Sequence, residues 1–465
     1  MRSATSIVSL PSLRKPPMEG PLDFRLKKMQ WVDVVLKLLI PVFLVSLFVL
    51  SLHYGAWAGY LELLNRHHYV SGLTALGIGL ALSLLVFQIV RTILWARYQP
   101  YPVPIAPLPR VTVIIPAYNE GAMVEKALYS VATSNYPAEL LEIICIDDGS
   151  KDDTWFYISQ ARQRYPHLIK TIRFTRNQGK KEGLYAGFRK ATGEFLVTID
   201  SDCVIDKDAL RQIVAPMVQD PQIGAVAGNV KVYNRHQSLF GKMLAVRFVL
   251  AFDFLRASQS RYGAVVCTPG ALSAYRRGTI MPYLEAWRHQ TFLGAPCQHT
   301  EDRALTNFVL RAGYFTVYQR TAVVHTLVPE SYRGLCKMYL RWERGNVRES
   351  FVQLGYLLTR YRSRHWLLPV VDFFMTQVEF FLAFISLPIL APLLLTSFVL
   401  QPLVMLKFFM VLGIISLIYM LYYIWLERDL EFVYGVIYGY FAFFCLQWIY
   451  PYAFLTVRDR RWLTR

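Results

Sequence analysis

The chain has 465 residues, 54% of them hydrophobic, and a formal net charge of +18. Soluble proteins contain about 45–50% apolar residues, so this excess argues against an ordinary soluble protein and indicates a membrane protein. The six cysteines are scattered and form no C-x-x-C pair, which supports neither a zinc site nor a disulfide framework. The positive charge fits anionic lipid or an anionic substrate as well as nucleic acid, so charge alone does not choose between these partners.

The first segment, residues 1–30, carries six basic and two acidic side chains, which predicts that it stays on the cytoplasmic side of a membrane. Two apolar runs follow, at 34–54 and 70–95, and each is long enough to span a bilayer. Lys37, near the start of the first run, can snorkel toward the interface and does not exclude a membrane span. The first run is too long for a signal peptide and is predicted to be an anchor. The short, weakly charged connection at 55–69 makes the two runs a hairpin that returns the chain to the cytoplasm.

After a Pro-rich linker at 98–110, short β-branched runs alternate with helical stretches. Four runs are predicted as buried strands, each followed by a polar or Gly-containing turn and then by a helix. This rhythm predicts an α/β domain with a mainly parallel sheet and helices on its faces. Ligands of such sheets bind at the carboxyl ends of the strands. The four predicted strands are 111–117, 141–147, 169–174 and 194–200.

Polar motifs lie where these strands end: PAYNE (116–120), DDGS (147–150), RNQGKKEG (176–183) and DSD (200–202). Taken singly, each has an ordinary explanation as a helix cap, a polar turn or a solvated helix face. Jointly, acidic groups at two strand ends and basic groups after a third would converge on one edge of the sheet. Such an edge suits a pyrimidine nucleotide diphosphate with its metal, because one or two carboxylates commonly hold Mg²⁺ on a phosphate.

Three further motifs follow the predicted sheet. CTPGALSAYRR (267–277) contains a Gly-containing turn and a short strand, which by itself would pass as the edge of a hairpin. HTEDRALTNFVLRAGY (299–314) shows an amphipathic helical pattern with Thr300 as its N-cap and acidic residues in the first turn. MYLRWERGNVRES (338–350) interleaves aromatic residues with arginines, and its simplest explanation is an interfacial helix whose basic residues face lipid phosphates.

Together these motifs resemble the family 2 glycosyltransferases of the GT-A fold, and more narrowly the membrane-embedded processive synthases of hyaluronan, chitin and cellulose. The similarity runs from about Arg110 to the last residue. It implies an α/β GT-A glycosyltransferase domain plus an α-helical transmembrane domain with interfacial helices. It also implies a UDP-sugar donor, a growing polysaccharide acceptor and a lipid bilayer as partners, and no nucleic acid.

The resemblance assigns the donor side of the site. Counterparts of PAYNE and of the DDGS aspartate cradle uracil and ribose in the family, which points to Tyr118, Glu120 and Asp148. The D-x-D motif binds the metal that carries UDP, so the expected cofactor is Mg²⁺ or Mn²⁺. Asp202 is then the metal ligand, with Asp200 toward the nucleotide.

The resemblance also assigns the catalytic and acceptor groups. The last aspartate of the T-E-D motif is the general base in the family, which points to Asp302. Glu301 and Arg303 flank it and are expected at the acceptor, as is Gly270 in the acceptor-binding segment 267–277. Lys180 is expected to bind the nucleotide.

This set of groups suits a single displacement. A positioned carboxylate takes the proton of the attacking hydroxyl, while metal and basic side chains stabilise the leaving diphosphate. One carboxylate without a second nucleophile predicts inversion, from an α-linked donor to a β-linked product. His325 is a weaker candidate for a further metal ligand, because a lone histidine is more often structural.

The stretch 338–350 resembles the Q-x-x-R-W motif of processive synthases, in which Trp floors the acceptor sugar and Arg approaches the diphosphate. This implies an acceptor role for Trp342 and a nucleotide role for Arg341. Met338 stands where the motif has glutamine, so the usual hydrogen bond of that position is in question.

Three more apolar runs, 367–400, 403–426 and 432–457, follow this stretch. Three crossings would leave the basic end of the chain outside the cell, contrary to the positive-inside rule. We therefore predict that 432–457, which is rich in aromatic residues and broken by Pro451, lies along the cytoplasmic interface and does not cross.

The end of the sequence, WLTR, resembles the W-G-T-R gating-loop motif of hyaluronan synthases, with Leu463 in place of glycine. The resemblance places Trp462 and Arg465 at the UDP. The predicted organisation is a basic cytoplasmic N-terminus (1–30), a transmembrane hairpin (31–98), a cytoplasmic GT-A domain with amphipathic interfacial helices (99–360), a second transmembrane hairpin (361–430), and an interfacial helix with a gating tail (431–465).

The leading hypothesis is a multi-pass enzyme of the cell (inner) membrane that polymerises sugar from UDP-GlcNAc, with or without UDP-GlcA, and exports the polysaccharide. A second hypothesis is a non-processive enzyme that adds one sugar to a polyprenyl phosphate. For that reaction the R-W helix and the gating tail would be unnecessary. A third is a catalytically inactive membrane scaffold or channel subunit, against which the complete acidic set argues.

Overall fold

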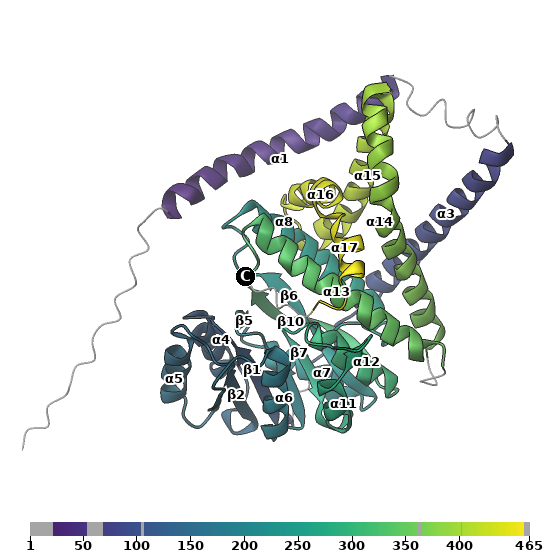
Figure 1. The fold of residues 1–465 in the computed structure, drawn as a ribbon. Coiled ribbons are helices and arrows are strands. Elements are labelled where there is room, and N and C mark those ends of the chain that lie inside the picture. The colour runs from purple at the N-terminus through teal and green to yellow at the C-terminus, as the bar shows by residue number, and fades with distance from the viewer. Residues whose placement is uncertain (1–21, 54–67, 104–106, 360–364, 401, 460–465) are drawn as a thin grey trace, which may run out of the picture.

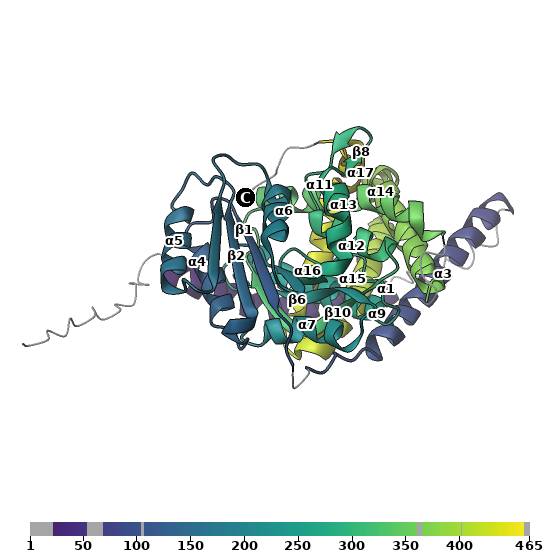
Figure 2. The same cartoon turned by 90° about the horizontal axis from the view of Figure 1, so that it is seen from below.

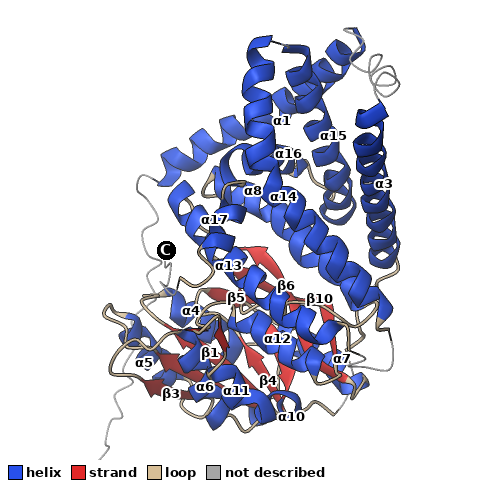
Figure 3. Ribbon diagram, turned by 45° about the vertical axis from the view of Figure 1, so that its right-hand side comes forward, coloured by secondary structure: helices blue, strands red, loops and turns tan. Residues whose placement is uncertain are grey.

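The computed structural model describes residues 22–53, 68–103, 107–359, 365–400 and 402–459. The strands gather in one half of the molecule and the long apolar helices in the other (Figures 1 and 3). Shorter helices, among them α8 (Leu239–Phe248) and α17 (Ile449–Leu455), lie between the two halves together with the longer α13 (Tyr332–Leu357).

Eight strands form one mixed sheet in the order β3-β2-β1-β4-β7-β6-β10-β5. The four strands predicted from the sequence form the parallel run β3-β2-β1-β4, and β6 and β10 are a further parallel pair, so the α/β prediction is confirmed. The strands of this sheet are β1 (Val111–Ala117), β2 (Leu141–Asp147), β3 (Ile169–Arg173), β4 (Phe195–Thr198), β5 (Cys203–Ile205), β6 (Ile223–Val232), β7 (Ser273–Arg276) and β10 (Phe315–Thr326).

Strand β7 comes from the segment 267–277, which by itself looked like a hairpin edge. It lies in the middle of the sheet, antiparallel to both β4 and β6. Hydrogen-bonding on both sides explains why its residues Ser273 to Tyr275 are fully buried. A separate small hairpin is formed by β8 (Thr291–Phe292) and β9 (Ala295–Pro296).

Both faces of the sheet are covered by helices (Figure 2). Val113 and Ile115 of β1 point into one apolar cluster, and Ile114 between them points into another on the opposite face. Because both faces are buried, the strands read as continuous apolar runs and not as alternating ones. The first cluster includes residues of α4 (Met123–Ala132), α5 (Thr154–Arg164) and α7 (Ala209–Gln219), and the second includes residues of α6 (Lys180–Lys190), α11 (Leu284–Arg288) and α12 (Glu301–Arg311).

Within the described ranges, four helices are long and apolar enough to cross a membrane. They correspond to the four apolar runs for which the sequence predicts membrane spans, although the first helix begins earlier, at Leu22. The helices are α1 (Leu22–His53), α3 (His68–Ala96), α14 (Leu367–Leu400) and α15 (Pro402–Glu427).

The last apolar run does not form one straight helix. It comprises α16 (Phe432–Phe441), the π-helical turn η4 (Ala442–Leu446) and α17, and it bends by 46° before α17. Pro451 lies in the first turn of α17, where it has no backbone N–H to continue the preceding helix. This bend is compatible with the predicted interfacial course, which stays a prediction.

The remaining short helices connect these elements or lie beside the sheet. Two of them, η2 and α9, continue α8. Of these, η2 packs against α15 and α9 packs against α3. The short helices are η1 (Ala138–Leu140), η2 (Val249–Phe254), α9 (Leu255–Ser260), α10 (Arg277–Ile280) and η3 (Met281–Tyr283).

Lys37, near the start of α1, is held by two carboxylates. Its Nζ lies 2.9 Å from a carboxylate oxygen of Asp33 and 3.2 Å from one of Glu431. Lys242 of α8 contacts the same Asp33 at 2.5 Å. The basic residue near the start of α1 therefore belongs to a charged cluster that ties α1 to α8 and to the chain before α16.

Helix α13 is amphipathic as predicted, but two of its arginines do not face lipid phosphates. Arg344 is buried and lies 3.1 Å from a carboxylate oxygen of Asp459. Arg348 is also buried and donates to Glu349 at 2.9 Å. The reading of this stretch as a helix with its basic face toward lipid is wrong for these residues, because α12 and α17 pack against α13.

Candidate active site

One cavity of about 2080 Å³ lies at the carboxyl ends of the central strands and extends to α14. Apart from His325, the weaker metal candidate, every predicted site residue that the structure describes lines it. Trp462 and Arg465, predicted at the nucleotide, lie outside the described residues. The lining residues among those predicted are Tyr118, Glu120, Asp148, Lys180, Asp200, Asp202, Gly270, Glu301, Asp302, Arg303, Arg341 and Trp342.

At one end of this cavity, Asp148 holds the loop that leads into α6. Its two carboxylate oxygens accept hydrogen bonds from the backbone N–H groups of Gln178 (2.7 Å) and Gly179 (2.8 Å). Burial raises the pKa of Asp148. Next to it, Gly149 has φ of +69°, and a Cβ there would come within 2.5 Å of the backbone of Arg176. The DDGS turn therefore needs its glycine to bring the 176–183 loop to the strand end.

The basic motif is not the solvated helix face that was its ordinary explanation. Lys180 Nζ lies 2.6 Å from Asp200 Oδ1 and 2.7 Å from Glu301 Oε1. Burial alone would lower the pKa of Lys180, but these carboxylates outweigh burial and raise it. Lys181 is buried too, and its Nζ donates to the carbonyl of Cys297 at 2.9 Å. Lys180 is therefore a fixed charge that joins the DSD motif to α12.

The DSD motif gathers hard oxygen atoms at the end of β4. One donor atom each from Asp200, Asp202 and Cys203 lie within 4.8 Å of one another. Burial raises the pKa of the Cys203 thiol, and sulfur is a soft ligand that does not suit a hard cation. His325 is not part of this group, because its Nε2 pairs with Asp206 Oδ1 at 3.1 Å. The donor set thus fits Mg²⁺ or Mn²⁺ held by two carboxylates.

Gly270 lies between the D-x-D motif and the T-E-D motif. Its backbone N–H donates to Asp302 Oδ2 at 3.1 Å. A Cβ at this position would lie 2.7 Å from Lys180 Nζ and 3.2 Å from Asp200 Oδ1. No side chain fits here without moving Lys180, so the glycine of the 267–277 segment lets the D-x-D and T-E-D motifs meet.

Asp302 and Glu301, at the start of α12, have pKa values pushed in opposite directions. Burial and the adjacent Glu301 raise the pKa of Asp302. Burial also acts to raise the pKa of Glu301, but Lys180 outweighs it and holds that pKa low. Two neighbouring carboxyl groups with separated pKa values are typical of assigned acid and base roles. Asp302 is the one poised to accept a proton, and Arg303 N–H fixes its Oδ1 at 2.7 Å.

Thr300 precedes α12 in a strained conformation. The sequence predicts it as the N-cap, and it occupies that position, but its side chain makes no capping hydrogen bond. Its φ of 55° is left-handed, which is uncommon for a β-branched residue. Arg348 donates to its Oγ1 at 2.9 Å, and a Cβ on Gly345 of α13 would collide with the Thr300 side chain. Packing against α13, not capping, therefore sets the start of α12.

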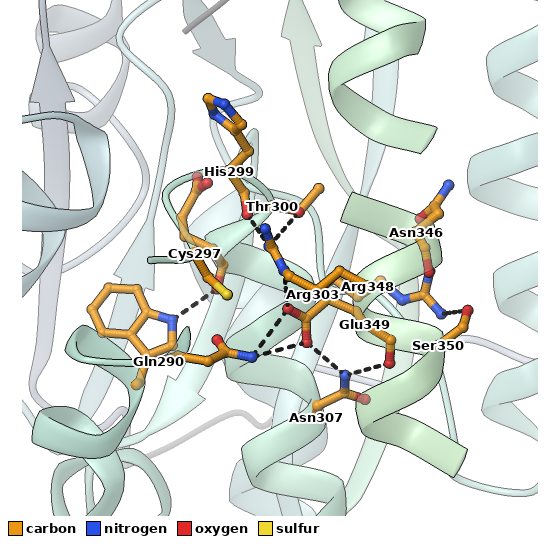
Figure 4. Close-up of polar contacts among 12 residues, drawn as sticks. Gln290, Cys297, His299, Thr300, Arg303, Asn307, Asn346, Arg348, Glu349 and Ser350 are labelled. Carbon is orange, nitrogen blue, oxygen red and sulfur yellow. Dashed lines mark hydrogen bonds and ion pairs between the residues drawn. The ribbon is translucent and has the colours of Figure 1, made fainter. Parts of the chain in front are cut away.

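A buried polar network joins α12 to α13 (Figure 4). Glu349 is fully buried and accepts hydrogen bonds from Arg348 Nε (2.9 Å), Asn307 Nδ2 (2.9 Å) and Gln290 Nε2 (3.2 Å). Beside it, Arg303 donates to Asn346 Oδ1 at 2.7 Å. These contacts fix the helix of Asp302 relative to the helix of Trp342.

Glu349 and Asn307 were not predicted as site residues, although both lie in motifs singled out from the sequence, because the resemblance assigns a role to other residues of those motifs. The available signal was weak. Asn307 interrupts the apolar pattern of α12, and the adjacent opposite charges of Arg348 and Glu349 interrupt that of α13.

Residues 112–283 match the family described as Glycosyl transferase family 2. An N-acetylglucosaminyltransferase of Azorhizobium caulinodans is 31% identical over 361 residues, which is 77% of this chain and 87% of that protein. A hyaluronan synthase of Streptococcus pyogenes is 31% identical over 363 residues, which is 77% of this chain and 83% of that protein. The chain belongs to glycosyl transferase family 2.

The fold of this family 2 glycosyltransferase also matches a solved structure. A mannosyltransferase of Pyrobaculum calidifontis, solved in complex with GDP-Man and Mn²⁺, superposes with a TM-score of 0.57 at 22% identity. The match covers 79% of this chain and 97% of that one. The predicted GT-A fold is confirmed, together with additional helices that are long and apolar enough to cross a membrane.

The cavity wall around Trp342 is aromatic. The Trp342 ring lies 6.2 Å from the ring of Phe248 and 5.7 Å from that of Tyr339. Met338, which replaces the motif glutamine, is buried one turn earlier and lines the same cavity. The same cavity is also lined by aromatic residues of α14 and α17, namely Phe373, Phe374, Phe380, Phe381, Phe384, Tyr450 and Phe454.

Proposed function

We propose that this protein is a processive, inverting β-glycosyltransferase that polymerises sugar from UDP-sugar donors and moves the polysaccharide across the membrane. One observation carries the proposal: the cavity is continuous from Asp148 at the sheet edge, past Asp302, to the aromatic residues of α14. A transferase that releases its product after one sugar needs the part of the cavity at Asp148 and the part at Asp302. It does not need the aromatic part at α14.

Asp200 and Asp202 would hold Mg²⁺ or Mn²⁺ at the donor end. When bound, the metal supplies positive charge to the departing diphosphate. Lys180, already fixed between Asp200 and Glu301, and Arg341 add positive charge at the same end. Glu301 would have two roles. It positions Lys180, and it contacts the acceptor as expected from the resemblance. The remaining donor contacts in this proposal are Tyr118, Glu120 and Asp148.

Asp302 would act as the general base. Its carboxylate is held by Gly270 N–H and Arg303 N–H, and its raised pKa makes it a better proton acceptor than an exposed aspartate. The acceptor hydroxyl loses its proton to Asp302 and attacks the anomeric carbon, while the diphosphate leaves from the opposite face. Trp342 provides a flat apolar surface for the acceptor sugar.

UDP-GlcNAc, with or without UDP-GlcA, is the proposed donor. The names of the two relatives, an N-acetylglucosaminyltransferase and a hyaluronan synthase, support this choice. The proposed organisation keeps the predicted boundaries, with the GT-A domain (99–360) on the cytoplasmic side of the inner membrane and hairpins at 31–98 and 361–430. Trp462 and Arg465 would close over the bound donor.

The test uses the purified full-length protein with UDP-sugars supplied singly and in pairs. We expect UDP release together with a long polymer for one donor or one pair, and loss of both in the presence of a chelator. Transfer of a single sugar to a polyprenyl phosphate, without polymer, would contradict processivity. UDP release equal to that of the Asp302→Asn variant for every donor would contradict the enzyme activity itself.

A further inference from the structure

Two arginines on the acceptor side of Asp302 are buried without a carboxylate partner. Arg256 of α9 is 9% exposed and Arg303 of α12 is 8% exposed, and both line the cavity. None of the ion pairs among the described residues includes either of them. Burying a charge without a counter-charge is costly, so such groups are retained where a ligand compensates them.

Arg256 is the clearer of the two cases. Its Nε donates to the carbonyl of Cys267 at 2.9 Å, and its guanidinium carbon lies 4.0 Å from the centroid of the Phe252 ring. Its Nη1 is enclosed and has no hydrogen-bond partner in the part of the chain that the structure describes. The side chain is thus held in place by one backbone oxygen and one aromatic face, and burial lowers the pKa of its guanidinium although Asp302 acts to raise it.

Figure 4 shows that the buried carboxylate of Glu349 is bonded to other side chains and not to Arg303. Glu349 is bonded to Arg348, Asn307 and Gln290. Arg303 reaches only neutral oxygens of α13, among them Ser350 Oγ at 3.1 Å, and its Nε has no partner among the described residues.

The diphosphate of the donor does not account for these charges. The donor end already has its own cation, Lys180, which contacts Asp200 and Glu301. Arg256 instead contacts Cys267, at the start of the turn whose Gly270 N–H reaches Asp302. It therefore lies on the side of the catalytic base where the acceptor and not the nucleotide would be.

We propose that the growing polysaccharide carries carboxylate groups, and that Arg256 binds one of them beside Asp302. This inference rests on the proposed function and narrows it to a polymer that contains a uronic acid. Arg303, on the adjoining wall of the cavity, supplies a second positive charge to the same acidic chain. Arg256 is then a specificity-determining residue for the acceptor.

The test compares two acceptors that differ only in charge. One is an oligosaccharide of alternating GlcNAc and GlcA, and the other is the same oligosaccharide with its carboxyl groups reduced to alcohols. The acceptor KM is measured with the full-length protein and a UDP-sugar donor. We expect the acidic acceptor to have a KM lower by about tenfold or more, because hydrogen bonds between charged groups are stronger than neutral ones.

Arg256→Gln should raise the KM of the acidic acceptor far more than that of the reduced one, so that the preference disappears. Arg256→Lys, which keeps the charge, should retain part of the preference and serves if the Gln variant fails to fold. Arg261→Gln is the matched control, because Arg261 is exposed and does not line the cavity, and it should keep the full preference.

Equal KM values for the two acceptors in the parent protein would overturn the inference while leaving the proposed function intact. A full preference in both Arg256 variants would overturn the role of Arg256, as would competition of a polyprenyl phosphate with the acidic oligosaccharide. Absence of transfer to either acceptor with every UDP-sugar would contradict the proposed function, and this inference with it.

Discussion

The donor and acceptor ends of the cavity compensate their charges in different ways. At the donor end, Lys180 is paired with Asp200 and Glu301, so its charge is fixed before any ligand binds. At the acceptor end, Arg256 and Arg303 have no carboxylate partner within the described ranges. In our proposal the donor end is therefore organised by the protein itself, whereas the bound acidic chain completes the charges of the acceptor end.

The largest expected loss of activity follows a change at Asp302, which lies between the donor end and the acceptor end. Asp302→Asn removes the proposed proton acceptor and keeps the size of the side chain. We expect polymer formation to fall about 10²–10⁴-fold, as is typical for loss of a general base, with UDP binding nearly unchanged. Turnover and UDP affinity are measured on the same preparation. Polymerisation at near the parent rate would remove Asp302 from the mechanism.

The pH dependence of the parent sharpens this assignment. Burial and Glu301 raise the pKa of Asp302, and only the deprotonated form accepts a proton. Activity should therefore be lost as pH falls through this raised pKa, at a higher pH than for an ordinary aspartate. Because the two carboxyl groups interact, the observed midpoint belongs to the Glu301–Asp302 pair. A profile that stays flat down to the usual range of an exposed aspartate would contradict the assignment.

The next effect concerns the network that fixes the acceptor end. Glu349→Ala leaves the buried charge of Arg348 without its partner, and breaking a buried ion pair in this way costs about 3–5 kcal/mol. Thermal unfolding in detergent should shift to lower temperature. Glu349→Gln is the matched control, because it keeps the hydrogen bonds from Asn307 or Arg348 in part and should lose less. If both variants unfold like the parent, the network does not hold α12 and α13 together.

A smaller effect is expected where the two helices touch. Gly345→Ala adds a methyl group that collides with the strained Thr300, and overpacking of this kind costs about 1–3 kcal/mol. Because the shift is transmitted to Asp302, we expect turnover to fall more than donor affinity. Gly355→Ala, in the same helix with open space around it, is the control and should behave like the parent. Equal behaviour of the two variants would show that the Thr300 contact is dispensable.

The smallest effect in free energy is expected at the donor end. Deleting Trp462–Arg465 should leave a folded, membrane-inserted protein, since chain termini seldom carry a core. We expect donor use to weaken about tenfold or more, through loss of the charge-assisted hydrogen bonds proposed for Arg465, and polymer yield to fall with it. Arg465→Ala should reproduce the change. An unchanged polymer yield would show that these residues have no role in donor use.

The two ends also differ in how far the sequence predicts them. The donor end follows from local patterns, because Asp148 and Asp202 directly follow apolar strands and parallel strands bring their carboxyl ends to one edge. The acceptor end depends on contacts between segments far apart in the chain. Neither the left-handed Thr300 nor its collision with a side chain at Gly345 is visible without the packing of α12 on α13.

Amphipathic patterns explain the remaining differences. The pattern of α13 predicts which residues are polar, but it does not tell what covers them. Arg344 and Arg348 thus read as lipid-facing although Asp459, Glu349 and the start of α12 bury them. Lys37 likewise has a partner, Glu431, that is remote in sequence and that no local pattern predicts.

Translocation through the cavity is tested most directly in sealed vesicles that contain the purified protein with its GT-A domain outward. UDP-sugar is added outside, and the polymer is then challenged with an added polysaccharide hydrolase. We predict a long polymer that the hydrolase cannot reach until detergent opens the vesicles, since the donor end and the membrane end belong to one cavity. Polymer that is fully digested in intact vesicles, or a product of single sugars on lipid, would contradict the account.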